Sequence, residues 1–152
     1  MPPPVPFAAS LNQLKQRFEP GLVIIPVGST VSFPNEDPIF HNVFSLSPAR
    51  QFDLGYYPAG ETRELKFDQA GIVQVYCHLH SDMNAAIVVV PTPWYTQPDE
   101  HASFSFSTVP AGSYTVVVWH KSAGFFRRKV QVSDQSPVAL SFEIPIQEAP
   151  SQ

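Results

Sequence analysis

The sequence has little cysteine, glycine or charge. Its 152 residues include one cysteine, Cys77, which excludes an internal disulfide framework and any four-cysteine zinc or iron–sulfur site. Only 14% of the residues are charged, with a formal net charge of −4, so we expect no nucleic-acid binding, which needs clustered positive charge. The longest apolar runs, such as 87–90, are too short to span a bilayer, and we expect no membrane span.

The first residues also lack the features of a secretory signal. Residues 2–6 are rich in proline and contain neither a basic region nor an apolar one, so they do not form a signal peptide. We therefore expect either a cytosolic protein or a mature form to which a start methionine was added. The sequence alone leaves both readings open.

The pattern of the remaining residues predicts an all-β fold. Seventeen prolines argue against long helices, while 43% hydrophobic residues suffice for a buried core. Many short alternating segments separated by turn residues are typical of a β-sandwich. Residues 50–60 read as a long irregular loop, and 11–19 as either a short helix or an irregular strand. The expected strands are 22–27, 30–34, 41–47, 62–67, 72–77, 85–90, 102–109, 113–120, 125–132 and 138–145.

The stretch 76–83 carries the most informative chemistry. Cys77 is the last residue of the predicted strand 72–77 and lies on its inward face, and His80 and Met83 follow it at steps of three. A thiolate, imidazoles and a weak axial thioether are the ligand set of a blue-copper electron-transfer site. That set needs a second histidine, and His41 supplies it after the turn-rich run 34–38.

These residues resemble the cupredoxin family of type 1 copper proteins. The spacing Cys-x-x-His-x-x-Met is that of the short ligand loop of amicyanin-like members, and the resemblance extends over residues 11–91. It implies a Greek-key β-sandwich with His41, Cys77 and His80 as strong copper ligands and Met83 as the axial one. It also implies that Asn42 ties the two ligand loops together by hydrogen bonds. The upstream residues that carry it are Phe18-Glu19-Pro20, Val23, Gly28, Thr30-Val31, Phe33, Asn35 and His41-Asn42-Val43.

A second, weaker resemblance concerns the later part of the chain. Residues 109–116 look like strands of a transthyretin-like or carboxypeptidase regulatory-like sandwich, as in bacterial methylamine-utilisation-type cupredoxins. We therefore expect a flexible segment (1–10), a copper-binding domain (11–91), a linker (92–99) and a smaller antiparallel β segment (100–148). A partial sandwich leaves an edge uncovered, so this segment is expected to pack on the copper domain, the N-terminal segment or a second copy.

The expected function is outer-sphere transfer of single electrons by one copper ion that cycles between Cu(I) and Cu(II), with no enzymatic turnover. The family resemblance places His80 at the surface edge where redox partner proteins dock. The apolar residues near the ligands in sequence, Pro38, Ile39, Phe40 and Leu79, are expected to form the docking patch. It also implies an exported or periplasmic protein.

Other functions remain open at this stage. The same ligands could serve a carrier or sensor of Cu(I). A zinc site with His78 as fourth ligand is disfavoured, because a thioether such as Met83 is a poor zinc ligand. An adhesion or scaffold module built on the later segment is a further option, and Cys77 could then be an ordinary buried thiol.

Overall fold

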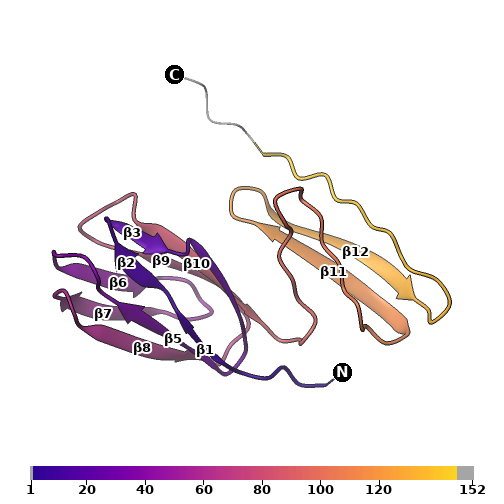
Figure 1. Cartoon of the computed structure of the whole chain (residues 1–152), viewed down its shortest axis with the longest axis horizontal. Coiled ribbons are helices and arrows are strands. Elements are labelled where there is room, and N and C mark those ends of the chain that lie inside the picture. Colours follow the sequence, from indigo (N-terminus) through magenta and orange to yellow (C-terminus); the bar gives the residue numbers. More distant parts are fainter. Residues whose placement is uncertain (1, 147–152) are drawn as a thin grey trace. The chain divides into compact units, whose positions relative to one another are not determined.

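The computed structural model describes residues 2–146, and its regular elements are all β-strands (Figure 1). The chain divides into two compact units, Met1–Tyr95 (unit 1) and Thr96–Gln152 (unit 2). The all-β class expected from the sequence is confirmed. Within the described range, no helix has the length and apolar character needed to cross a membrane.

Unit 1 contains two sheets and a hairpin. The smaller sheet has the order β1-β5-β8, and the larger sheet has the order β4-β10-β9-β6-β7. β2 and β3 form the separate hairpin. The strands are β1 (Ala8–Ser10), β2 (Asn12–Leu14), β3 (Arg17–Glu19), β4 (Leu22–Pro26), β5 (Ser29–Pro34), β6 (His41–Ser45), β7 (Phe52–Tyr57), β8 (Thr62–Phe67), β9 (Gly71–Tyr76) and β10 (Asn84–Val90).

The two sheets enclose one hydrophobic core. Alternation along β5 turns Val31 and Phe33 inward, and alternation along β9 does the same for Val73 and Val75. β10 lies between β4 and β9, and its residues are largely buried, as a central strand requires. The core is therefore a sandwich interior to which both sheets contribute.

Two expectations about unit 1 were wrong. Residues 8–10 are not a free segment, because β1 pairs in parallel with β5. Residues 50–60 are not an irregular loop, because β7 pairs with β6 through a register shift near Asn42. β7 is an edge strand in which only Tyr57 is fully buried, so its sequence shows no clear alternation. The open question about 11–19 resolves to the β2–β3 hairpin.

The described residues of unit 2 form an antiparallel hairpin, β11 (Gly112–His120) with β12 (Gly124–Val132). The strands expected at 102–109 and 138–145 are absent from the described part of the chain. Aromatic side chains instead contact each other there, with the ring centroids of Phe104 and Phe142 6.5 Å apart. Alternating apolar residues make a strand only where a neighbouring strand accepts their backbone hydrogen bonds. The transthyretin-like resemblance stays a prediction, and residues 147 and 148 lie outside the described range.

Candidate metal centre

Neighbouring strands bring the predicted ligands to one end of the larger sheet. His41 is the first residue of β6, and Cys77 directly follows β9. The connection from Cys77 to Met83 is closed by two peptide hydrogen bonds, from Cys77 N–H to the Met83 carbonyl (3.3 Å) and from Met83 N–H to the His80 carbonyl (2.9 Å). The β9–β10 ladder begins at the pair Tyr76 and Asn84, so this loop is short and tied at its base.

Three ligand atoms converge. Cys77 Sγ lies 3.8 Å from His41 Nδ1 and 3.9 Å from His80 Nδ1, and all three atoms are within 4.8 Å of one another. Three donors bound to one ion at about 2.0–2.3 Å in a trigonal arrangement lie about 3.5–4.0 Å apart, which fits the two distances from Cys77 Sγ. His41 and Cys77 are buried and His80 is partly exposed. The set of two imidazoles and one thiol is therefore a potential copper site.

Met83 is buried, with 1% of its surface exposed, and belongs to the same hydrophobic cluster as Cys77. Its peptide group is hydrogen bonded to both Cys77 and His80, as described above. A thioether is the weak axial donor of blue-copper sites, so the role of Met83 as fourth ligand stays a prediction.

Asn42 connects the two segments that carry the cluster. Its side-chain oxygen accepts the peptide N–H of His78 (3.1 Å), and its side-chain amide donates to Asp53 (2.8 Å). The buried Asn42 thus joins β6 both to the ligand loop and to β7. Hydrogen bonds of this kind hold a ligand-bearing loop in one arrangement.

A carboxylate that the sequence analysis did not single out contacts the cluster. Asp37 Oδ2 lies 2.6 Å from His41 Nε2, on the ring nitrogen that does not face Cys77. Burial raises the pKa of Asp37, but hydrogen bonds from His41 and from the peptide N–H groups of Gln16 and Lys15 outweigh it and hold this pKa below its usual value. The only available signal was an acidic residue four positions before the histidine, within a run of turn residues.

His78 lies outside the cluster, which disfavours the zinc alternative. Its ring stacks on Phe44 with centroids 3.8 Å apart and an interplanar angle of 3°. Its Nε2 lies 3.7 Å from a carboxylate oxygen of Asp53, and both side chains are largely exposed. His78 is engaged at the surface and is not placed to act as a fourth ligand.

No protein-family model matches the chain, and no curated protein matches it. Solved structures do match. A reduced amicyanin variant has a TM-score of 0.50 at 24% identity, over 55% of this chain and 82% of that protein. The Cu-containing nitrite reductase of Thermus scotoductus SA-01 has a TM-score of 0.52 at 26% identity, over 57% of this chain and 23% of that protein. The purple cupredoxin of Nitrosopumilus maritimus has a TM-score of 0.49 at 23% identity, over 54% of this chain and 99% of that protein.

These likenesses concern the first unit. Unit 2 contains only residues 96–152, so a match over more than half of the chain must include unit 1.

Proposed function

Starting from the cupredoxin fold of unit 1, we propose that this chain binds one copper ion through His41, Cys77, His80 and Met83 and carries single electrons between partner proteins. The observation that carries the proposal is the approach of two imidazole Nδ1 atoms to one buried thiol, at 3.8 and 3.9 Å. A cysteine, two histidines and a weak axial methionine are the donors of blue-copper sites. Copper, when bound, supplies a one-electron couple between Cu(I) and Cu(II).

The residues around the donors favour electron transfer over transport or sensing of Cu(I), which remains the alternative. His41 is the first residue of a strand, Cys77 immediately follows another, and Asn42 joins their segments. A site held in this way resists rearrangement, which suits a centre that must accept and release electrons without moving its ligands. A protein that transfers its copper ion to another protein needs ligands that can move and release the ion.

We also propose that the chain performs no substrate turnover of its own. Catalytic metal sites keep one position open for water or substrate, whereas the ligand set proposed here supplies four protein donors. The nitrite reductase match does not argue otherwise, because it extends over only 23% of that enzyme.

The proposed docking site for partner proteins surrounds His80. This ligand is partly exposed, while His41 and Cys77 are buried, so electrons would leave through its edge. The apolar residues near the ligands in sequence are exposed, with Phe40 at 57% and Leu79 at 55%. Small, weak contacts are typical of electron-transfer complexes. The proposed patch comprises Pro38, Ile39, Phe40 and Leu79.

The organisation and location of the chain are part of the proposal. We assign copper binding to residues 11–91, a linker to 92–99 and a separate β segment to 100–148. In the described part of unit 2, β11 and β12 pair only with each other, so their outer edges could join a second copy of the chain. Export to the periplasm would suit a copper electron carrier. Light scattering and cell fractionation test these two points.

The experiment that tests copper binding is a titration of metal-free protein with Cu(II), followed by visible absorption and EPR. We expect an intense thiolate-to-copper band with narrow hyperfine splitting, lost in Cys77→Ser and altered in His80→Gln. The matched control is His101→Gln, an exposed histidine of unit 2. Voltammetry then separates the two functions, since an electron carrier gives a reversible couple. A colourless complex, or ready loss of copper to a chelator without reversible redox behaviour, would contradict the proposal.

A further inference from the structure

Asp37 and His41 form a buried pair beside the proposed metal ligands, although Asp37 is not itself a proposed ligand. His41 has no exposed surface and Asp37 is 4% exposed. One ring nitrogen of His41 contacts the carboxylate at 2.6 Å, and the other faces Cys77 Sγ at 3.8 Å. The two nitrogens of this histidine therefore face two different groups, the carboxylate of Asp37 and the thiol of Cys77.

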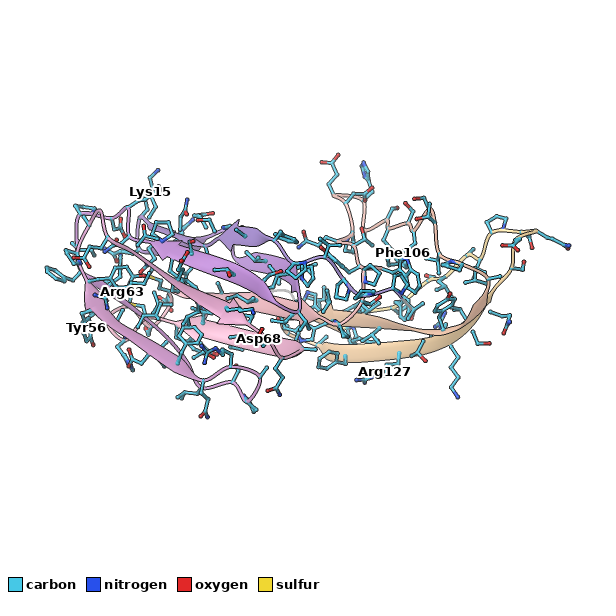
Figure 2. The ribbon with its side chains drawn as sticks, turned by 90° about the horizontal axis from the view of Figure 1, so that it is seen from below. Lys15, Tyr56, Arg63, Asp68, Phe106 and Arg127 are labelled. Atoms are coloured by element: carbon cyan, nitrogen blue, oxygen red, sulfur yellow. The ribbon has the colours of Figure 1, made fainter. Side chains whose placement is uncertain are left out.

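The carboxylate of Asp37 is itself held in place from a distant part of the sequence. The peptide N–H of Lys15 donates to Oδ1 at 2.7 Å, and that of Gln16 donates to Oδ2 at 2.8 Å. Lys15 and Gln16 form the turn of the β2–β3 hairpin with φ of 54° and 58°, values that allow successive N–H groups to converge on an anion. The Lys15 side chain points outward from unit 1, so its backbone makes the contact (Figure 2).

The turn that contains Asp37 is fixed as well. Asp37 N–H donates to the side-chain oxygen of Asn35 at 3.0 Å. The side-chain amide of Asn35 donates to the carbonyls of Ile39 and Tyr57, at 2.9 and 3.0 Å. Hydrogen bonds from the hairpin turn and within its own turn thus hold the carboxylate of Asp37 in place, in addition to its contact with His41.

We propose, on the premise of the copper function above, that Asp37 is a positioning residue that holds His41 with its proton on Nε2 and whose charge favours the oxidised centre. An ionised carboxylate can only accept, so the hydrogen atom between the two groups belongs to Nε2. In the neutral ring Nδ1 then carries the free lone pair, directed toward the thiol. A carboxylate on the outer nitrogen also makes a metal-bound imidazole a stronger donor.

The charge of Asp37 has a predictable direction of effect. The oxidised centre carries one more positive charge than the reduced one, and a buried negative charge nearby stabilises the more positive state. Replacing Asp37 with a neutral residue should therefore weaken Cu(II) binding more than Cu(I) binding. Removing such an outer partner typically changes metal affinity by 10–100-fold. A tenfold fall in the ratio of Cu(II) to Cu(I) affinity raises the reduction potential by about 59 mV for a one-electron couple.

The first measurement needs no variant and no metal. Nitrogen-15 NMR of the metal-free full-length protein reports which ring nitrogens of His41 carry a proton. We expect a proton on Nε2, exchanging slowly with water because the group is buried. A ring protonated on Nδ1 alone would overturn the assignment, whatever the outcome of the copper titration.

The second measurement compares Asp37→Asn with Asp68→Asn. Asp68 is exposed and lies well away from Lys15 on unit 1, so its substitution removes the same charge without touching the cluster (Figure 2). We expect the reduction potential to rise in Asp37→Asn and to stay at the wild-type value in Asp68→Asn. Equal losses of Cu(I) and Cu(II) affinity with an unchanged potential would reduce Asp37 to a structural role and contradict the proposal.

The two proposals fail in distinguishable ways. If wild-type protein shows no thiolate-to-copper band, the copper function fails, while the NMR result still decides the position of the His41 proton. If the band is present and the potential is insensitive to Asp37, only the inference about Asp37 fails. Should Asp37→Asn not fold, the NMR measurement on wild-type protein still decides the proton placement.

Discussion

Tyr57 lies directly opposite His41 in the β6–β7 ladder, so a fully buried tyrosine shares a strand pair with the first histidine of the candidate metal centre. The Tyr57 hydroxyl donates to the Phe33 carbonyl at 2.7 Å and accepts from the side-chain amide of Gln13 at 2.7 Å. The hairpin strand β2, which contains Gln13, is in this way connected to both sheets beside the site. The guanidinium of Arg63 lies over the Tyr57 ring, 4.7 Å from its centroid.

This environment predicts how stability depends on pH. Burial raises the pKa of Tyr57 to about 12, against smaller opposing effects of the Gln13 hydrogen bond and the Arg63 charge. The pKa of Tyr57 in the folded protein lies above its unfolded value of about 10. The contribution of Tyr57 to the free energy of unfolding is therefore fully present below about pH 10 and is lost as the pH rises toward 12. Urea unfolding of copper-free protein should show this loss in wild type and not in Tyr57→Phe.

At neutral pH the same substitution should destabilise unit 1 by about 1–3 kcal/mol, because the Phe33 carbonyl and the Gln13 amide lose a buried partner. The difference in free energy of unfolding between wild type and Tyr57→Phe should then become smaller between pH 10 and 12. Tyr56→Phe is the matched control, since Tyr56 is 52% exposed at the edge of unit 1 (Figure 2). If the difference in free energy of unfolding stays constant from pH 7 to pH 12, burial does not raise the pKa of Tyr57 as stated.

Asn42 should matter for metal affinity although it offers no metal ligand here. Asn42→Ala removes the acceptor for the His78 peptide N–H and the donor to Asp53. We expect copper affinity to fall by about 10–100-fold, as is typical when a residue that orients a ligand is removed. Competition with a chelator of known affinity measures the change. Asn12→Ala, in the β2 strand, provides the control, and equal affinities in the two variants would exclude the connecting role.

The convergence of His41, Cys77 and His80 was predictable because two of these residues are close in sequence, while the role of Met83 as a ligand stays a prediction. Cys77, His80 and Met83 occupy one short stretch of sequence. His41 is far from them along the chain, but the residues around it resemble those around the first histidine ligand of cupredoxins. Asp37 was missed because some of its contacts are made by residues that lie far from it in sequence. Its partners Lys15 and Gln16 are far away in sequence, and in the run 34–38 an acidic residue reads as one more turn residue.

The strand pattern was predictable only where burial imposes alternation. Strands such as β5 and β9 have one face on the core and were found within a residue or two. The edge strand β7 has a single buried side chain, and Gly55 and Asp53 make it look like a loop. The opposite error occurred at 102–109 and 138–145, where apolar residues alternate without a partner strand in the described structure, and Phe104 and Phe142 contact each other instead.

Copper binding should not need unit 2. Among the described residues, the buried core cluster lies between Leu11 and Val89. The proposed ligands lie between His41 and Met83. A chain that ends at Tyr95 should therefore fold and give the same visible band as the full chain. Absorption and thermal unfolding of the two forms provide the comparison. A shortened chain that folds but lacks the band would show that residues 96–152 contribute to the site.

Electron self-exchange between copies of the protein should report the proposed docking patch. If two copies meet through the surface around His80, Leu79→Lys places like charges opposite each other and slows exchange, by about tenfold or more at low salt. Added salt should recover part of the rate, because the repulsion is screened. NMR line broadening in mixtures of the oxidised and reduced protein measures the rate. Leu46→Lys introduces the same charge at a 72% exposed leucine just beyond the other end of β6, and so controls for net charge. If both variants exchange at the same rate, the contact surface lies elsewhere and the patch of Pro38, Ile39, Phe40 and Leu79 has no docking role.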